Sequence, residues 1–284
     1  MHLEQTSRLR VVVATGFVRR MRGGSQACLL TTADGEMYVV KFRNNPQHLR
    51  TLVNEIVATL CANRIGITTP ELCLVYVDQS LATNHVADLA IRLAHGSVPI
   101  QAGMHLGSCH PSTVANPAVV YDFLPALRSW NIANFRDFVG VFVLDKWIAN
   151  SDSRQAIFVR MREPDRQDAR YQIQMIDHGS AFGGSSWRFA DAPLAGRYHD
   201  PTVYSDVTSL TDFEPWIQQI RAIDESFVQL VMRHIPQAWV AGESRELIVL
   251  LERLMRRRTM LASLIQDVLD CKSNPFVNWG MSRV

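Results

Sequence analysis

The sequence of 284 residues predicts an α+β protein built from two lobes, with an antiparallel, β-rich N-lobe and a mostly α-helical C-lobe. Three patterns lead to this expectation. Short apolar runs separated by turn signals occupy residues 10–42, helical periodicity dominates after residue 124, and a long amphipathic helix is predicted near residues 243–270. We place the boundary near residue 123, which gives lobes of residues 1–123 and 124–284.

The N-lobe is expected to begin with an antiparallel meander. Residues 10–20 and 26–32 have strand character and are separated by a glycine-containing turn. Asp34-Gly35 is a tight-turn signal, and a third strand is predicted over residues 36–42. Three neighbouring antiparallel strands therefore open the fold.

A helix is expected after this meander. Apolar residues recur at helical spacing from Leu49 to Leu60, Pro46 suits the beginning of a helix, and Gly66 suits its end. The Gly-, Pro- and Ser-containing residues 95–117 are expected to form a surface loop. The remaining strands of the N-lobe are predicted over residues 72–78, 87–93 and 117–123.

The C-lobe begins with an apolar face at helical spacing over residues 134–149, which predicts a helix. Two short strands are predicted over residues 155–160 and 171–176, around a polar turn at residues 161–170. We expect these strands to form an antiparallel hairpin.

Composition limits the classes of function. A formal net charge of +2 and a pI near 8.3 give no dominant charged surface for nucleic acid or membranes. No apolar run approaches the roughly 18–20 residues of a membrane helix, and no signal-peptide core is present. The five scattered cysteines favour a reducing, cytoplasmic location. His105, Cys109 and His110 lie close together in HLGSCH, but a metal site needs another ligand, so we interpret this stretch as a polar loop.

The stretch Arg22-Gly23-Gly24-Ser25-Gln26 connects the first two predicted strands. Adjacent glycines let backbone N–H groups approach an anion closely, as a phosphate-binding loop requires. Adjacent glycines are also common in hairpins that only reverse the chain. The loop alone does not decide between these interpretations.

Lys41 lies beside Val40 and Phe42 in the third predicted strand. Its ammonium group needs a partner there, unless the lysine faces water from an edge strand. Glu55 on the following helix flanks the apolar stripe and is the candidate partner. A strand lysine held by a helix glutamate can be aimed at nucleotide phosphates.

Asp152 precedes the first strand of the predicted hairpin, and Asp177 directly follows the second strand. The open end of an antiparallel hairpin would bring these carboxylates together, with Asn150 nearby. Such a set suits Mg²⁺ binding and the orientation of a hydroxyl group. Each aspartate alone could be a helix cap or a turn residue. Together with the glycine turn, the lysine and the glutamate, their order favours a functional site between the lobes.

At these residues the chain resembles the HipA-like kinases, within the protein-kinase-like group that includes the phosphatidylinositol kinases. Residues 150–154, NSDSR, are similar to the N-x-D-R-H catalytic loop of that family, and residues 176–179, IDHG, are similar to its metal motif. Residues 54–71, NEIVATLCANRIGITTPE, resemble its glutamate helix and the connection that follows. The resemblance covers about residues 10–270 and implies the bilobal kinase fold.

The resemblance also implies a set of roles in an ATP- and Mg²⁺-dependent phosphotransferase. Asp152 would orient the acceptor hydroxyl as catalytic base, with Asn150 and Arg154 in the same catalytic loop, and Asp177 would bind Mg²⁺. For the nucleotide, Lys41 supported by Glu55 would hold the α- and β-phosphates, and the backbone amides of Gly23, Gly24, Ser25 and Gln26 would cover them. The hinge beside the adenine would be formed by Tyr121, Phe123 and their neighbours up to Leu124.

Two departures from the family pattern bear on activity. The Arg-His pair after the catalytic aspartate is Ser153-Arg154 here, and the metal-binding asparagine five residues after that aspartate is replaced by Ile157. Isoleucine has no oxygen to offer a hard cation. Gln155 supplies an amide oxygen and is our candidate substitute ligand; the alternatives are a single-metal site or a degenerate site.

We expect a kinase acting on serine or threonine of a protein, with Ser25 as a candidate autophosphorylation site. An antitoxin-like protein is a candidate partner, as in a toxin–antitoxin pair. The alternatives are a pseudokinase that binds a nucleotide or a partner without turnover, and a lipid or small-molecule kinase. Neither membrane insertion nor direct nucleic-acid binding is expected.

Overall fold

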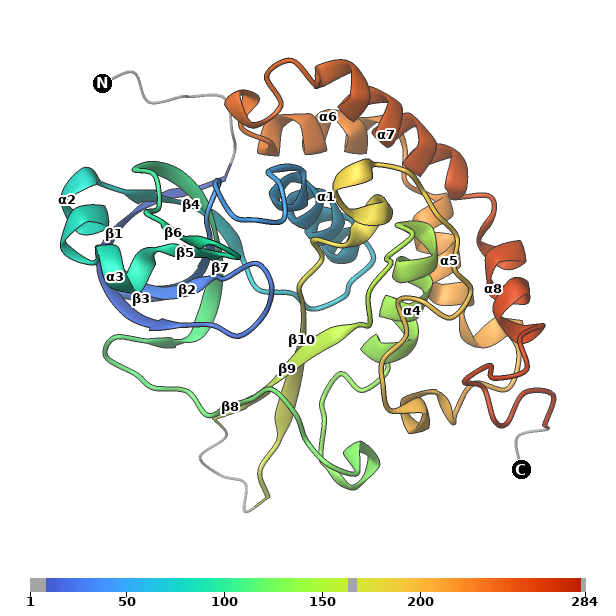
Figure 1. The fold of residues 1–284 in the computed structure, drawn as a ribbon. Helices are drawn as coiled ribbons and strands as arrows, with labels where there is room; N and C mark the ends of the chain where they lie inside the picture. The colour runs from blue at the N-terminus through green and yellow to red at the C-terminus, as the bar shows by residue number, and fades with distance from the viewer. Residues whose placement is uncertain (1–8, 163–167, 282–284) are drawn as a thin grey trace.

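The computed structural model describes residues 9–162 and 168–281, and it has the two-lobed α+β architecture that the sequence predicts (Figure 1). The first lobe contains a β-barrel and the second is mostly helical. The strands are β1 (Val11–Arg20), β2 (Cys28–Thr32), β3 (Glu36–Lys41), β4 (Leu72–Val77), β5 (Ile91–Leu93), β6 (Gly96–Val98), β7 (Gly103–Thr113), β8 (Val120–Tyr121), β9 (Gln155–Arg160) and β10 (Tyr171–Ile176). The helices are α1 (Arg50–Arg64), α2 (Gln79–Asn84), α3 (Val86–Leu89), α4 (Asp137–Trp147), α5 (Glu214–Arg221), α6 (Glu225–His234), α7 (Ser244–Arg257) and α8 (Leu261–Leu269).

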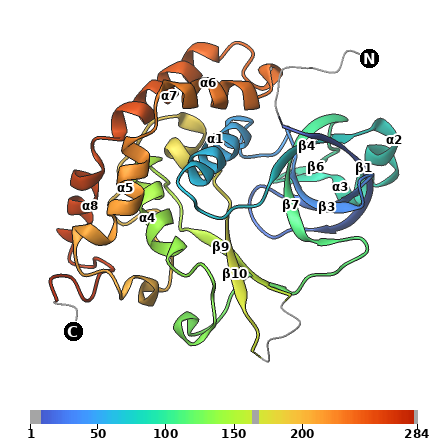
Figure 2. The ribbon, with the colours of Figure 1, turned by 180° about the vertical axis from the view of Figure 1, so that it is seen from behind.

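Five strands close the barrel in the order β1-β2-β3-β7-β4, which Figure 2 shows from behind. The predicted meander of β1, β2 and β3 is antiparallel, while β1 and β4 pair in parallel and complete the ring. Closure leaves no unpaired sheet edge, and the interior is filled by side chains. Those that are fully buried include Cys28, Leu30, Tyr38, Val40, Cys73 and Val75.

Strand β7 shows that the predicted surface loop over residues 95–117 was wrong. β7 lies between β3 and β4 and pairs with both. A Cβ atom at Gly107 would lie 2.5 Å from the Val75 side chain and 3.0 Å from the Cys73 sulfur. The small residue that suggested a loop is therefore one that close packing inside the barrel requires.

Other boundaries also differ from the sequence expectations. Residues 87–93 contain the end of α3 and all of β5, and the strand predicted over residues 117–123 is reduced to β8. The long C-terminal helix is divided into α7 and α8 after Arg257, whose buried guanidinium donates to the backbone carbonyls of Lys146 and Trp147. Periodicity alone cannot reveal such a tertiary contact.

The three-stranded sheet, ordered β10-β9-β8, carries the predicted hairpin. β9 and β10 pair over their full length, from Tyr171 opposite Arg160 to Ile176 opposite Gln155. β8 pairs with the other edge of β9. The open end of the hairpin therefore points toward the junction of the lobes (Figure 1).

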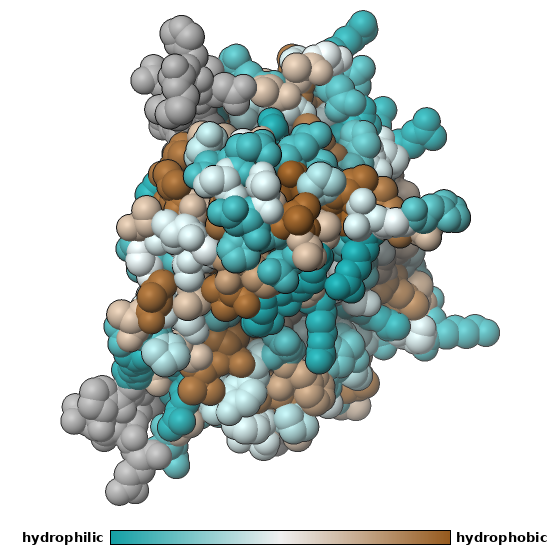
Figure 3. All heavy atoms as spheres, turned by 60° about the vertical axis from the view of Figure 1, so that its left-hand side comes forward, coloured by the Kyte–Doolittle hydropathy of each residue, from teal (hydrophilic) through white to brown (hydrophobic). Residues whose placement is uncertain are grey.

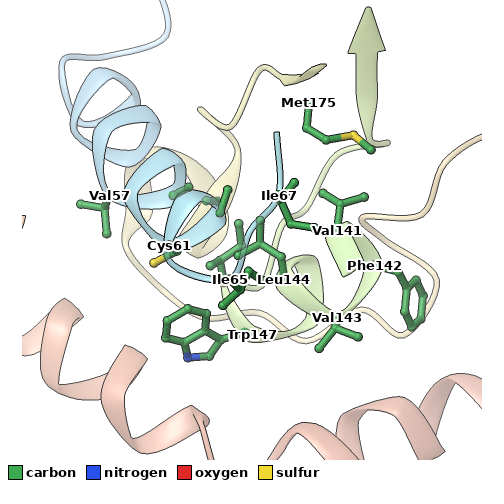
Figure 4. Close-up of a cluster of buried hydrophobic side chains, with 14 of the residues drawn as sticks. Val57, Cys61, Ile65, Ile67, Val141, Phe142, Val143, Leu144, Trp147 and Met175 are labelled. Atoms are coloured by element: carbon green, nitrogen blue, oxygen red, sulfur yellow. The ribbon is translucent and has the colours of Figure 1, made fainter. Parts of the chain in front are cut away.

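A hydrophobic core joins α1 to the second lobe. Figure 4 shows Cys61 of α1 close to Leu144 and Trp147 of α4, and all three side chains are fully buried. The indole N–H of Trp147 donates to the carbonyl of Leu254 in α7, at 2.8 Å. This core fixes the position of α1, the helix that carries Glu55.

Helices α5, α6, α7 and α8 form the outer layer of the second lobe (Figure 2). Figure 3 shows hydrophilic and hydrophobic side chains interspersed over one face of the molecule. None of the described helices is long and apolar enough to cross a membrane.

The His105 side chain of β7 is buried and hydrogen-bonded within the barrel. Its ring is fully buried, Nδ1 accepts the backbone N–H of Arg43 at 3.1 Å, and Nε2 lies 2.9 Å from the carbonyl of Gln101. Burial lowers the pKa of His105 to about 4. Within residues 9–162 and 168–281, no group of three His, Cys, Asp or Glu side chains is arranged to hold a metal. The stretch HLGSCH lies within strand β7 of the barrel, so the predicted polar loop was wrong.

The neutral His105 is expected to make the fold sensitive to acid. Unfolding returns the pKa of His105 to about 6.5, so between about pH 6.5 and pH 4 the unfolded chain binds one proton more than the folded chain. The folded state therefore loses stability relative to the unfolded state as pH falls through this range. The free energy of unfolding should decrease by up to about 1.4 kcal/mol per pH unit from this residue. Urea unfolding of the wild type and His105→Gln at pH 7, 5.5 and 4.5 measures the difference, and identical pH slopes would contradict it.

Candidate active site

A cleft of about 210 Å³ lies where the barrel meets the β8-β9-β10 sheet. Its walls come from the β1–β2 loop, β3, α1, β7, β8 and the β9–β10 hairpin, so both lobes contribute. Its charged and polar lining residues include Arg19, Arg22, Ser25, Lys41, Glu55, Asp122, Gln155, Asp177 and His178. Apolar residues complete the lining, among them Ala27, Val39, Leu72, Val120, Ile157 and Met175.

Lys41 connects two acidic residues inside this cleft. Its Nζ lies 2.8 Å from Glu55 Oε2 and 2.9 Å from Asp177 Oδ1. Burial works against the charged forms, but the two carboxylates hold the pKa of Lys41 above its usual value, and Lys41 holds the pKa of Asp177 below its usual range. The predicted Lys41–Glu55 pair is therefore present, and it is extended by Asp177.

Asp177 directly follows the end of β10, where the hairpin register places it beside Gln155. Its backbone has a φ of 58°, a left-handed conformation that turns the chain away from the strand. The amide Nε2 of Gln155 lies 3.1 Å from Asp177 Oδ2. The Asp177 side chain is 40% exposed, so its carboxylate is accessible from the cleft.

Asp152 lies in the exposed loop between α4 and β9, outside the residues that line the cleft. Its backbone N–H donates to the side-chain oxygen of buried Asn150 at 3.2 Å, and its carbonyl accepts the N–H of Gly196 at 3.0 Å. One carboxylate oxygen accepts the N–H of Ser153 at 2.7 Å. The loop is thus held from both sides at the same end of the hairpin as Asp177, and Asn150 serves as its internal support.

Arg154 does not face the cleft. Its side chain is fully buried and forms a two-point ion pair with Asp145 of α4, which is equally buried. The remaining guanidinium nitrogen lies 3.1 Å from both the carbonyl of Ile176 and Nδ1 of His178. Arg154 therefore links the Asp152 loop, α4 and the segment that carries Asp177.

The Asp145–Arg154 pair is expected to contribute strongly to stability. Asp145→Ala would leave a buried guanidinium without its counter-ion and lower the free energy of unfolding by about 3–5 kcal/mol. Because the cost comes from an uncompensated charge, the double variant Asp145→Ala/Arg154→Leu should lose less than the sum of the two single variants. Urea unfolding provides the measurement, and strictly additive losses would contradict the prediction.

His178 packs against this pair and is neutral. Burial, Arg154 and Lys41 keep the pKa of His178 well below its usual value. Because Arg154 donates to Nδ1, the ring hydrogen is placed on Nε2. The backbone N–H of His178 donates to Glu55 Oε2 at 3.0 Å, so one glutamate oxygen holds both Lys41 and the metal motif.

Only part of the glycine loop, residues 22–26, lines the cleft. Ser25 lines the cleft, whereas Gly23 and Gly24 are exposed. The N–H of Gln26 is used in a turn to the carbonyl of Gly23 at 3.2 Å. The Gln26 side chain makes two hydrogen bonds with the backbone of Arg92, at 2.7 and 2.8 Å, which fasten the loop to β5.

The residues expected to form the hinge alternate between facing the cleft and facing solvent. Val120 and Asp122 line the cleft, while Tyr121 and Phe123 are 41% and 57% exposed. The Tyr121 ring contacts Tyr171, and the Phe123 ring contacts His199. Much of this wall is supplied instead by the end of β7, at Ser108, Cys109, His110 and Pro111, which was expected to lie in a surface loop.

The side chains of the cleft were expected to hold a divalent cation. Asp177 would supply carboxylate oxygens, the ligands that Mg²⁺ accepts. Gln155 donates its amide nitrogen to Asp177 and would offer its amide oxygen only after the side-chain amide turns over. Ile157 lines the same cleft and supplies only hydrocarbon. The residues of the cleft would therefore suit one divalent cation, and Ile157 offers no side-chain oxygen at the position where the family pattern has an asparagine.

Two supporting residues were missed in the sequence. Asp145 and Asn54 are polar residues within apolar helical runs, and both are buried. A buried polar residue needs a partner, so these positions could have been singled out, although their partners lie far away in the sequence.

The chain is similar to known kinases in sequence and in fold. The family model described as HipA-like kinase matches residues 15–269. Among solved structures, the Helicobacter pylori proinflammatory kinase CtkA is similar with a TM-score of 0.55 and 14% identity, covering 94% of this chain and 98% of that one. The Golgi casein kinase with Mn/ADP bound is similar with a TM-score of 0.45 and 13% identity, over 99% of this chain and 76% of that one. A search of curated proteins gave no match.

Proposed function

The chain belongs to the HipA-like kinase family, and we propose that it transfers the γ-phosphate of ATP to a serine or threonine hydroxyl of a protein. The observation that carries this proposal is the position of Lys41, which joins Glu55 and Asp177 within one cleft formed by both lobes. A purely structural ion pair would have no need of an accessible carboxylate facing a cavity.

In this proposal, each residue works mainly by positioning and by neutralising charge. Lys41 binds the phosphates nearest the adenosine, and Ser25 and its neighbours cover them from the barrel side. Asp177 and Gln155 hold the divalent cation, which neutralises phosphate charge when bound. Asp152 accepts a hydrogen bond from the acceptor hydroxyl and takes its proton.

Two arginines extend the positive charge of the cleft. Arg19 and Arg22, at the end of β1 and in the glycine loop, both line it together with Lys41. Because Ile157 removes one metal position, cationic side chains on the barrel side would supply part of the charge that a second cation provides elsewhere. We therefore favour a single-metal site over a degenerate one.

Regulation and partners remain proposals that follow from the same site. Ser25 lies in the cleft lining, so phosphate on its hydroxyl would compete with ATP for the same groups. The antitoxin-like partner and the cytoplasmic location, expected from the sequence, stay predictions.

The test is transfer of label from γ-labelled ATP. The purified chain should label itself or a general protein acceptor in Mg²⁺ or Mn²⁺ and lose this activity in EDTA, with the label recovered as phosphoserine or phosphothreonine. Tight ATP binding without transfer to protein would instead indicate a pseudokinase. Transfer only to lipid or small hydroxyl compounds would identify the other alternative.

A further inference from the structure

Asn54 makes an unusually complete set of hydrogen bonds with the segment after Asp177. Its side-chain nitrogen lies 2.9 Å from the carbonyl oxygen of Gly179 and 3.0 Å from those of Ala181 and Gly184. Its side-chain oxygen accepts the indole N–H of Trp187 at 2.7 Å. Asn54 is fully buried, so water does not compete for these bonds.

The segment bound by Asn54 contains a 3₁₀ helix, Ala181–Ser186, that is interrupted by non-helical backbone. Phe182, Gly183, Gly184 and Trp187 all have positive φ values, between 54° and 77°. This interrupted backbone directs the carbonyls of Gly179, Ala181 and Gly184 toward Asn54, and a buried carbonyl without a partner is costly. The amide of Asn54 supplies the missing donors.

Asn54 also lies on the face of α1 that supports the active site. Thr51, Asn54 and Glu55 are spaced three and four residues apart, so they share one side of the helix. A Cβ atom at Gly179 would lie 3.6 Å from Thr51 and 3.7 Å from Glu55 Oε2, which shows how closely this face approaches the metal motif. Glu55 holds Lys41 and the N–H of His178 from the same face.

Arg50 closes the outer side of this arrangement, one turn before Asn54. Its guanidinium stacks on the Trp187 ring at 4.4 Å and donates to the carbonyl of Ser185 at 3.0 Å. It also forms a two-point ion pair with Glu243, at 2.9 and 3.1 Å.

We propose that Asn54 is a positioning residue that fastens the segment of residues 178–187 to α1, so that Asp177, Lys41 and Glu55 stay assembled. The proposal rests on the proposed function, since it assigns Asn54 a role in holding the metal ligand Asp177. Asn54 touches neither the nucleotide nor the metal in this account. Its effect should therefore appear in cation binding and not in the affinity for metal-free ATP.

The experiment compares Asn54→Asp with Asn63→Asp, the same substitution near the other end of α1, where Asn63 is exposed and accepts a hydrogen bond from Thr69. Asn54→Asp keeps the shape and removes the donors. Calorimetry of ATP binding at increasing Mg²⁺ should give a cation requirement about tenfold higher than that of the wild type, with metal-free ATP affinity changed less than about twofold. Trp187→Phe keeps the ring on Arg50, removes one donor and should shift the cation requirement in the same direction.

Hydrogen exchange tests the fastening without nucleotide. The amides of residues 178–187 should exchange faster in Asn54→Asp than in the wild type, and at the wild-type rate in Asn63→Asp. Unchanged exchange would overturn the proposal. An equal loss of metal-free and metal-dependent ATP affinity would overturn it as well. If the wild type binds no ATP, the proposed function fails, and the exchange result still decides the role of Asn54.

Discussion

Asp177→Asn is expected to lower the rate of phosphoryl transfer on the order of 10³-fold, because the cation and its charge neutralisation depend on this carboxylate. The substitution suits the site sterically, since asparagine tolerates the left-handed backbone at a φ of 58°. Lys41 keeps its contact with Glu55, so the fold should be retained. The loss is therefore expected in function, with little change in stability.

Steady-state label transfer with saturating ATP and a series of Mg²⁺ concentrations measures this effect. Asp224→Asn is the matched control, because Asp224 caps α6 through the N–H of Ser226 and asparagine caps a helix equally well. The control should transfer phosphate at the wild-type rate. A transfer rate in Asp177→Asn within tenfold of the wild type would show that Asp177 does not hold the metal.

Asp152→Asn is expected to reduce the turnover rate about 10²–10⁴-fold while the affinity for ATP changes little. Asparagine keeps the side-chain oxygen that accepts the N–H of Ser153, so the loop geometry should persist. It cannot take a proton from the acceptor hydroxyl. Because Asp152 lies outside the cleft lining, nucleotide binding does not depend on it.

Turnover and ATP affinity must be measured on the same preparation. Label transfer gives the turnover rate, and calorimetry with Mg²⁺ gives the dissociation constant for ATP. A large loss of affinity with unchanged turnover would place Asp152 in nucleotide binding and remove it from the role of base.

The sequence was sufficient for the parts of the site whose geometry is local. The hairpin of β9 and β10 has the predicted bounds, and its register alone brings Gln155 beside Asp177. The Lys41–Glu55 pair was also predictable, because a strand lysine and a nearby helix glutamate are separated by only one connection. The bilobal α+β class and the family resemblance are confirmed.

The parts that could not be predicted depend on contacts between distant segments. Gly107 and its neighbours suggested a loop, because closeness to Cys73 and Val75 is a property of the closed barrel. Arg154 was assigned to the catalytic loop by position, and only the fold shows its guanidinium buried against Asp145. We therefore propose that Arg154 positions the loop, since a fully buried side chain cannot contact a substrate.

Asn54 illustrates the same limit. It stands next to Glu55 within an apolar helical run, a pattern that indicates burial but does not indicate its partners. Its partners lie more than a hundred positions later, at separations of 125 to 133 residues. Side chains whose roles come from such contacts become visible only when the chain is folded.

The most direct test of the central proposal follows the two ends of ATP separately. The wild-type chain is incubated with Mg²⁺ and either γ-labelled or α-labelled ATP, at enzyme in excess over nucleotide, and the label on protein is quantified. The Lys41–Glu55–Asp177 cleft predicts that the γ-label appears on serine or threonine while the α-label stays in ADP. Transfer of the α-label, or fully bound ATP with no γ-label on any acceptor, would contradict the assignment of this chain as an active phosphotransferase.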